Sequence, residues 1–506
     1  MIQWALAAAL AAATPSESYD GLVSEGVARG RAGERAEAAS LFDRAIALAP
    51  ERPEARVERG GLLFLEKRYD SSAAELGRAL QIREDAYTRE LLGSSLHLAG
   101  RPDEALAVWN VAGRPTLGTL AISGLRHTRD RVARRELRLE AGSLLSLKGI
   151  RESRLRLAEV GAFERIAVRA SPLGNGVADV EVALVERHGL ARGWFDLAVK
   201  TGVEAIQHRV RLRCANLAGE GIAIGAGRRW EENRPETSAT IDWPRPLGLD
   251  AVLHVRAFDG RQAFELQGQR VDQKARGVEL GLRHVFGAAS VGQLGFRTSN
   301  RDFSTTELPP GRVAGLALGV ERRLLDRHRL RADLALQGFF AGSAVGSDER
   351  FSSGLLRAKG FVLLAPPDDG FRSASVLAMQ VVLGLGSEGM PIDEAFAAGG
   401  SPDMELPLRA HAQTEDGILG RTPLGRSLGL VNLEWRRRLL AKAGFRFGVV
   451  LSCDLALIQE PGRTALSDLG LGLRLDLPGA GRIRVDYGHG LTDGANAIFL
   501  GFGETF

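Results

Sequence analysis

The chain has few cysteines and no long apolar run in its interior. Only two of its 506 residues are cysteine, Cys214 and Cys453, and they form no Cys-x-x-Cys pair. Two distant thiols exclude a disulfide scaffold and argue against structural zinc, so we expect both to be buried. No segment after the N-terminal region has the roughly 18 uncharged apolar residues of a membrane helix. If the chain crosses a membrane, strands must cross it.

An excess of charge of either sign is absent as well. The sequence has 66 Lys and Arg against 62 Asp and Glu, with no stretch that interleaves basic and aromatic residues. Nucleic acid is therefore not an expected partner. Aromatic residues make up only 6%, whereas glycine is abundant at 62 residues. This composition favours many strands joined by tight turns, and the length allows several domains.

Residues 1–14 have the layout of a secretory signal peptide. A short apolar run is followed by small residues and a polar stretch, with cleavage expected near Ala13. No Lys or Arg precedes the run, so a misplaced start or an ordinary buried helix is the alternative. We predict that the protein is exported.

Residues 15–115 contain a repeat with spacings of 34 and then 33 residues. Three glycines each precede a second-helix pattern with a recurring bulky residue: Gly26, Gly60 and Gly93, then Phe42, Leu76 and Trp109. This period is typical of two short antiparallel helices that stack through small residues. The segment resembles three tetratricopeptide repeats, and a plain helical bundle is the alternative. Such repeats bind protein segments or hold domains apart.

Residues 116–188 read as a strand, two helices and two further strands. The order resembles a POTRA domain. The resemblance rests on residues where the elements begin and end: Gly124, Gly142, Gly161, Phe163 and Glu186. Two of the glycines can end helices in a left-handed conformation, and the phenylalanine can cap a small core. A generic α+β module is the alternative. The resemblance implies an exposed strand edge that accepts another chain as an added strand.

From residue 189 to residue 506 helical periodicity disappears, and segments of about ten residues alternate between apolar and polar positions. In residues 468–477 the leucines share one face, while glycines, Arg474 and Asp476 share the other. Charged residues of a soluble sandwich face water, whereas those of a transmembrane barrel line the lumen. We predict a multidomain chain: a helical repeat solenoid, a small α+β domain and an antiparallel transmembrane barrel of about 16 strands.

The C-terminal segment alternates in the same way. Ile498, Leu500, Phe502 and Phe506 share an apolar face, so Phe506 is expected to complete the lipid face of the closing strand. A terminal Phe of this kind resembles the sorting signal of bacterial outer-membrane barrels, with Phe502 as its period-2 partner.

Two glycines in this segment predict a weak seam. Gly501 and Gly503 have no side chains to pack and cost entropy to order. The closing strand, from residue 496, is expected to pair with the first strand, near residues 194–199. We predict weak pairing there and sideways opening of the barrel.

A long loop separates the strand pattern that ends near residue 385 from the one at 427–439, and loops of this length are usually functional. The loop resembles the sixth extracellular loop of the BamA/TamA superfamily of outer-membrane assembly and translocation barrels, where Phe and Gly-Gly precede an Arg-Gly-aromatic tip. The matching residues are Phe396, Gly399, Gly400 and Arg409. Ala410 and His411 depart from the Gly-aromatic pair. This departure affects the expected tight-turn geometry and not the match of the arginine.

The resemblance also implies a lock between the loop and the lumen. Five strands follow the loop, as expected in a sixteen-stranded barrel of this superfamily. The second of them places Asp454 on the lumenal face by alternation, where the superfamily has an Asp that meets the loop arginine. Glu434, one strand earlier, is the competing acceptor. Arginine suits the position because its planar fork can bind a carboxylate bidentately.

The remaining sequence gives no sign of covalent chemistry. The histidines are isolated, the loop carboxylates Asp393 and Glu394 are expected only to be solvated, and the glycine-rich strand has no helix after it. We therefore expect no enzyme, no metal site and no cofactor.

The sequence thus predicts a bacterial outer-membrane barrel with periplasmic N-terminal domains. Its expected role is to dock client polypeptides and assist their insertion or translocation. Membrane lipid and lipopolysaccharide are further expected partners, and a periplasmic protein is a candidate partner of the repeats. A porin-like exporter of polysaccharide with helical repeats is the alternative.

Overall fold

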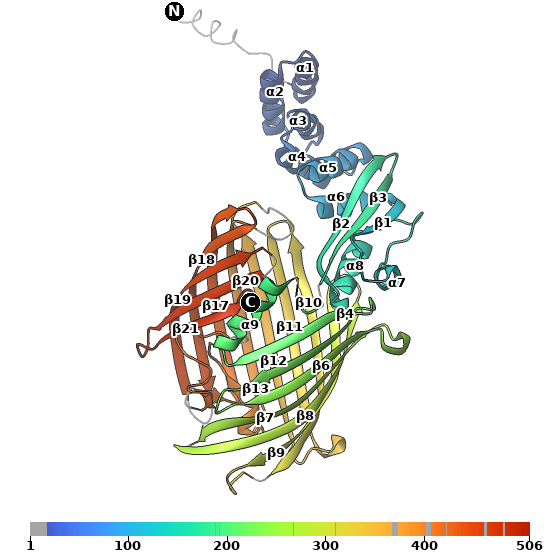
Figure 1. The fold of residues 1–506 in the computed structure, drawn as a ribbon. Coiled ribbons are helices and arrows are strands. Elements are labelled where there is room, and N and C mark those ends of the chain that lie inside the picture. Colours follow the sequence, from blue (N-terminus) through green and yellow to red (C-terminus); the bar gives the residue numbers. More distant parts are fainter. Residues whose placement is uncertain are drawn as a thin grey trace, which may run out of the picture. The chain divides into compact units, whose positions relative to one another are not determined.

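In the computed structural model, helices occupy the N-terminal part of the chain and strands most of the remainder (Figure 1). The structure describes residues 18–187, 189–191, 193–266, 268–308, 310–366, 373–400, 406–420, 423–459, 463–478 and 481–506. The predicted signal peptide lies outside these residues. No helix in the described part of the chain combines the length and apolar character needed to span a membrane.

The chain divides into two compact units. The first comprises Met1–Ala121, Leu139–Ile150 and Arg169–Glu181, and the second comprises Ile122–Arg138, Arg151–Val168 and Val182–Phe506. The boundary passes through the small domain, so the helical repeats belong to the first unit and the barrel to the second.

The helices of the first unit pack as successive pairs. Ser18 and Asp85 accept hydrogen bonds from the backbone N–H groups of Gly21 and Thr88, which caps two of the helices. The helices are α1 (Tyr19–Arg31), α2 (Arg35–Leu48), α3 (Glu54–Leu65), α4 (Tyr69–Ile82), α5 (Ala86–Leu98) and α6 (Pro102–Val111).

Glycines allow the two helices of each pair to approach closely. A Cβ atom at Gly26, Gly60 or Gly93 would lie 2.6, 2.6 or 2.1 Å from the side chains of Phe42, Leu76 and Trp109, respectively. These residues are the ones that recur in the sequence, so the repeat reflects the contact between paired helices. Their classification as tetratricopeptide repeats stays a prediction.

The small domain has the predicted order of elements, and its sheet has the strand order β1-β3-β2. Glu186 accepts hydrogen bonds from three successive backbone N–H groups, of which that of Thr128 is the shortest at 2.7 Å. Burial raises the pKa of Glu186, but the hydrogen bond from the Thr128 side chain and those from the three backbone N–H groups outweigh it and hold the pKa below its ordinary value. The elements are β1 (Thr116–Ser123), α7 (Asp130–Arg134), α8 (Leu147–Val160), β2 (Phe163–Gly174) and β3 (Val177–Glu186).

A helix occupies the place predicted for the first barrel strand. α9 spans Trp194–Ile206, so the prediction of a strand at residues 194–199 is wrong. Those six positions are apolar except for Asp196, a run too short to distinguish a buried strand from a helix. Over the longer segment, however, Asp196, Lys200 and Glu204 recur at a spacing of four, which places them on one face of a helix.

The barrel is an antiparallel sheet whose strands follow the chain order from β4 to β21. The sheet has 16 strands, one of which is the short β15, paired in parallel with β7. Within the described residues no ladder joins β4 to β21. The fold class predicted from the sequence is confirmed.

The long strands of the barrel are β4 (Arg209–Leu217), β5 (Ile222–Arg229), β6 (Glu236–Pro244), β7 (Val252–Leu266), β8 (Gln269–Phe286), β9 (Ser290–Phe303), β10 (Gly311–Arg327), β11 (Leu330–Ala341), β12 (Phe351–Leu363), β13 (Ser375–Gly386), β17 (Ser427–Lys442), β18 (Phe445–Gln459), β19 (Arg463–Leu477), β20 (Gly481–Gly490) and β21 (Asn496–Phe502). Short 3-10 turns lie at Pro246–Gly248 and Ser343–Val345.

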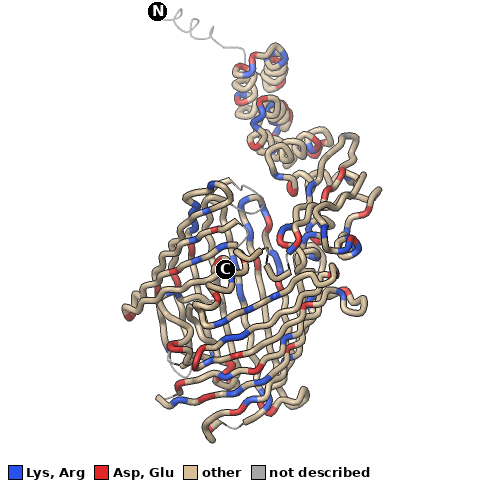
Figure 2. Tube along the Cα trace, viewed as in Figure 1, with Lys and Arg blue, Asp and Glu red and all other residues tan. Residues whose placement is uncertain are grey.

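Side chains of the barrel alternate between an exposed apolar face and a more buried polar face. On β18, Leu451 and Leu455 are each 48% exposed, whereas Asp454 is fully buried. On β19, Leu471 is exposed and Arg474 is buried, as the alternation predicts. Figure 2 shows charged residues along the strands and not only at their ends. Charged groups therefore line the lumen and leucines cover the outer surface.

The C-terminal residues turn into the barrel. β21 ends at Phe502, and Gly503 adopts a φ of +78°. The backbone carbonyl of Phe506 accepts a hydrogen bond from lumenal Arg436 at 3.0 Å, and its ring centroid lies 5.2 Å from the guanidinium carbon. The prediction that Phe506 completes the lipid face is therefore wrong. A glycine with positive φ reverses the chain direction, and the period of two does not reveal this.

Candidate functional site in the barrel lumen

The predicted loop connects β13 to β17 and has short elements of its own. These are the 3-10 turn η3 (Ile392–Glu394) and the strands β14 (Phe396–Ala397), β15 (Ile418–Leu419) and β16 (Leu424–Gly425). β14 pairs with β16, while β15 pairs with β7 of the wall. The side chains of the loop contact lumenal residues on both sides of the barrel, so the loop folds back into the lumen.

The motif residues Phe396, Gly399 and Gly400 lie at close contacts. The ring of Phe396 packs against β13, where a Cβ on the glycine beneath it would lie 3.0 Å from the ring. A Cβ at Gly400 would lie 2.2 Å from the ring of Phe499 on β21, and one at Gly399 would lie 2.4 Å from the Gln413 backbone. Both loop positions therefore require glycine.

Arg409, at the tip of the loop, is fully buried among carboxylates. Its guanidinium donates to Asp454 Oδ1 at 2.5 Å and to Glu434, and its Nε lies 3.9 Å from Asp486 Oδ1. The backbone N–H of Arg409 donates to Asp454 Oδ2 at 3.1 Å. These carboxylates come from β18, β17 and β20, so one side chain of the loop joins three strands. Charge-assisted bonds of this kind are strong and directional.

Two glycines of the wall make room for the loop tip. A Cβ at Gly488 of β20 would lie 2.1 Å from the carbonyl carbon of Arg409, and one at Gly470 of β19 would lie 2.9 Å from its Cδ. The two glycines are paired neighbours in the sheet. At Gly488 the obstacle is backbone, so any side chain there would displace the loop.

Ala410 and His411, which replace the Gly-aromatic pair, make polar contacts. The N–H of Ala410 donates to Asp468 Oδ2 at 2.6 Å, and the His411 ring nitrogens lie 2.9 and 2.8 Å from Asp468 and Asp493. The hydrogen bond to Asp468 raises the pKa of His411 to about 9, although burial opposes this. The bond from His411 also lowers the pKa of Asp493. His411 is therefore protonated at neutral pH and holds the tip to β19 and to the β20–β21 turn.

The upstream part of the loop has a separate anchor. Asp393 pairs with Arg301 of β9 at 2.7 Å and accepts a hydrogen bond from Gln273 of β8 at 2.6 Å. Glu394 accepts one from Arg297 at 2.6 Å. The side chains of Arg301 and Asp393 are only 2% and 6% exposed, so the expectation of solvated carboxylates at this place is wrong. The loop is thus fixed to both halves of the wall.

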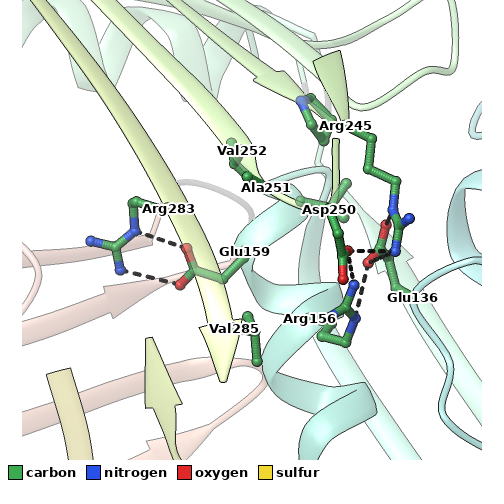
Figure 3. Close-up of a pocket in the computed structure, with 11 residues that line it drawn as sticks. Glu136, Arg156, Glu159, Arg245, Asp250, Ala251, Val252, Arg283 and Val285 are labelled. Carbon is green, nitrogen blue, oxygen red and sulfur yellow. Dashed lines mark hydrogen bonds and ion pairs between the residues drawn. The ribbon is translucent and has the colours of Figure 1, made fainter. Parts of the chain in front are cut away.

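A second group of ion pairs joins α8 to the barrel within the second unit (Figure 3). Glu159 of α8 binds Arg283 of β8 at 2.9 Å, and Arg156 pairs with Asp250. Arg245, before the 246–248 turn, binds the same Asp250 at 2.8 Å. Figure 3 shows these side chains directed toward one another. The group acts as a structural attachment because its charged groups are already engaged with each other.

These features define a class of protein, a transmembrane β-barrel with a small α/β domain before it and a loop held in the lumen by an arginine. No protein-family model matches the chain, and no curated protein matches it. Among solved structures it is similar to CdiB from Escherichia coli, with a TM-score of 0.54 and 12% identity over 77% of this chain and 76% of that one.

Two further solved structures are similar to this chain. CdiB from Acinetobacter baumannii has a TM-score of 0.50 and 13% identity over 80% of this chain and 81% of that one. The crystal structure of BamA from Haemophilus ducreyi lacking POTRA domains 1–3 has a TM-score of 0.45 and 14% identity over 76% and 83%. The two CdiB structures show a shared fold.

The structure places three residues predicted from the sequence, Arg409, Asp454 and Glu434, in direct contact. Glu434 is a second partner of the arginine and not a competitor of Asp454. Sequence reasoning missed Asp468 and Asp486, although both lie on the charged faces of strands that alternate clearly. The signal that could have found them was the position of an acidic residue on the lumenal face of β19 or β20, where it can meet the loop.

Proposed function

We propose that this chain is a bacterial outer-membrane barrel that docks client polypeptides and assists their insertion into, or translocation across, the membrane without covalent chemistry. The observation that carries the proposal is Arg409, buried in the lumen between Asp454 and Glu434. A segment held by hydrogen bonds, ion pairs and apolar packing can shift within the lumen without bond cleavage. The resemblance of the loop to that of the BamA/TamA superfamily supplies the role.

The N-terminal domains supply docking surfaces for the client. In the small sheet, β1 and β2 are the edge strands. An extended client segment can add to such an edge through main-chain hydrogen bonds. The helical pairs α1–α6, as tetratricopeptide repeats, hold a second segment or a periplasmic protein. Membrane lipid and lipopolysaccharide surround the barrel in this proposal.

The contact between Arg409 and Asp454 is proposed to lock the loop. A double-mutant cycle on Arg409→Ala and Asp454→Asn tests it, with protease cleavage of the loop as the readout. We expect each single variant to expose the loop and the double variant to add little, because the two residues act as one contact. Additive effects would remove the lock from the proposal.

The seam between β4 and β21 is proposed to open sideways. Among the described residues Gly501 pairs with β20 alone, and Gly503 turns the chain away from the wall. Gln207, at the end of α9, donates to the backbone carbonyl of Leu500 at 2.6 Å. A bifunctional maleimide between Gln207→Cys and Leu500→Cys, in a chain with the native cysteines replaced by serine, should block client insertion. Full activity of the cross-linked protein rules out sideways opening.

Phe506 and Phe502 are proposed to form a sorting signal at the end of the barrel. Deletion of Phe506 should lower the amount of protein in the outer membrane far more than deletion of Glu51 in a turn of the repeats. The inward position of Phe506 applies to the folded barrel, whereas a sorting signal is read before folding. Equal membrane levels for the two deletions refute the signal.

The function itself is tested in a strain that lacks the protein and is complemented with wild type or Arg409→Ala. We expect some outer-membrane or secreted proteins to be lost and to be restored by wild type far more than by the variant, with surface polysaccharide unchanged. Quantitative proteomics and sugar analysis provide the readouts. If the levels of outer-membrane and secreted proteins are unchanged and surface polysaccharide is lost, the result favours a polysaccharide exporter.

A further inference from the structure

Helix α9 has an unusual distribution of polar and apolar side chains. Trp194, Phe195 and Ile206 are 81%, 50% and 70% exposed, whereas Asp196 and Glu204 are only 3% and 7% exposed. A helix on a water-soluble surface shows the opposite arrangement, with its apolar stripe against the protein. The exposed stripe of α9 therefore lacks an apolar neighbour within the described chain.

The acidic face of α9 meets side chains of β4 that point into the lumen. Glu204 pairs with Arg209 at 3.2 Å and with Arg211 at 2.8 Å, both on β4. Leu212, which directly follows Arg211 on the strand, is 40% exposed on the outer face. By the alternation of β4, the two arginines point toward the lumen. Glu204 therefore faces the lumenal side at the edge of β4, and the apolar arc opposite it points outward.

The position of α9 is at the open seam of the sheet. The helix packs on β4, and Gln207 directly after it binds the carbonyl of Leu500 on β21 at 2.6 Å. These are the two strands that no ladder joins among the described residues. Figure 1 shows α9 between the green strands that begin the sheet and the red strands that end it. The helix thus touches both edges of the wall.

We propose that α9 is a lipid-facing helix that closes the barrel wall between β4 and β21. Its occupant is the acyl-chain region of the membrane, because the exposed stripe continues the apolar outer surface of the edge strands, where Leu212 and Ile498 are 40% and 71% exposed. A short amphipathic helix with Trp and Phe on one face suits the membrane interface. The inference rests on the proposed membrane location and is independent of client transport.

Fluorescence of the full-length protein in vesicles tests the proposal. Emission is compared in phosphatidylcholine and in its acyl-brominated analogue, and the contribution of Trp194 is the difference between wild type and Trp194→Phe. We expect bromination to reduce that contribution at least about twofold, as for a tryptophan at the lipid interface. Trp435→Phe provides the positive control on the outer face of β17, and Trp109→Phe provides the negative control in the repeats.

Each result of this experiment decides a different point. Quenching of the Trp435 contribution without quenching of the Trp194 contribution overturns the proposal for α9 and leaves the membrane location intact. If acrylamide quenches Trp194 instead, the stripe faces water in the lumen and the proposal also fails. If neither residue responds to bromination, the membrane location itself fails.

A second measurement examines the closure of the wall. Glu204→Gln removes the charge that binds Arg209 and Arg211, so the wall should leak and the conductance in planar bilayers should rise severalfold. Glu232→Gln, in the turn between β5 and β6, is the matched control and should leave conductance unchanged. Retention of the heat-modifiable band on a gel shows that each variant is folded. Unchanged conductance for a folded Glu204→Gln overturns the closing role.

Discussion

The helical repeats and the barrel place the same residue types in opposite positions. In the repeats Leu76 is fully buried, and the ion pair of Arg52 with Asp20 has side chains that are 39% and 78% exposed. In the barrel Leu471 is 49% exposed, and the pair of Arg409 with Asp454 has side chains that are 1% exposed. Whether a leucine is stable at the surface therefore depends on the surrounding medium, which is water for the repeats and lipid for the barrel.

The largest difference in effect is expected between substitution of Arg409 in the lumen and substitution of Arg52 in the repeats. Arg409→Ala takes the arginine away from buried Asp454, whereas Glu434 and Asp486 keep Arg436 and Arg474. Loss of one partner of a buried pair costs about 3–5 kcal/mol, less where water enters. The loop should become sensitive to protease while the barrel keeps its heat-modifiable migration. Arg52→Ala, which removes an exposed pair, should change neither readout. Equal behaviour of the two variants would mean that burial of the pair in the lumen has no energetic consequence.

A core leucine of the repeats should be nearly as sensitive. Leu76→Ala leaves a cavity at a fully buried position, which typically costs about 2–5 kcal/mol. Hydrogen exchange of α4 in the full-length protein should accelerate strongly. Leu65→Ala is the control, because Leu65 is 67% exposed and should have little effect. Similar exchange in both variants contradicts the packing of the helix pairs.

Arginine in place of an exposed leucine distinguishes lipid from water directly. Leu471→Arg on the outer face of β19 should destabilise the barrel in vesicles by about 2–4 kcal/mol if the residue lies near the bilayer midplane. Leu65 in the repeats is more exposed than Leu471, so Leu65→Arg should change the stability of the repeats very little. Urea unfolding in lipid vesicles measures the first, and hydrogen exchange measures the second. A harmless Leu471→Arg would show that the outer face of the barrel does not meet lipid.

The smallest effect is expected from pH. The pKa of His411 is raised from 6.5 to about 9, so its stabilising contribution is complete below 6.5 and is lost as pH rises through about 9. Between pH 7 and pH 10 the loop tip should become moderately more accessible to protease. His411→Asn should abolish this dependence, while Arg409 keeps its charge throughout. An unchanged pH profile in the variant would show that His411 does not cause it.

The sequence predicts the barrel well because a lumenal face and a lipid face require strict alternation, and β17 to β20 carry it over many residues. The same argument placed Asp454 on the lumenal face, whereas its pairing with Arg409 was implied by the resemblance of the loop, with Glu434 as the competing acceptor. The prediction from alternation failed at two points. Gly503 turns Phe506 inward, and the charged residues of α9 lie four positions apart rather than two.

The loop contacts could be predicted only in part. Arg409 was found through its motif, but its full surroundings need the register between strands, which a single sequence does not give. The pairing of Asp393 with Arg301 joins residues far apart in the chain, and neither has a local signal. Gly488 has the same difficulty, since a strand glycine more often indicates a bend or bulge than a seat for another segment.

The glycine at position 488 has a consequence for the order in which the wall is built. The backbone of Arg409 fills the space above Gly488, and the carboxylates around it belong to β17, β18 and β20, all of which follow the loop in the chain. The seat of the arginine therefore exists only when these strands have paired, because its carboxylates come from three different strands. The tip of the loop can take its final position only together with or after the pairing of these strands, so an error in their register would leave the loop without its binding site.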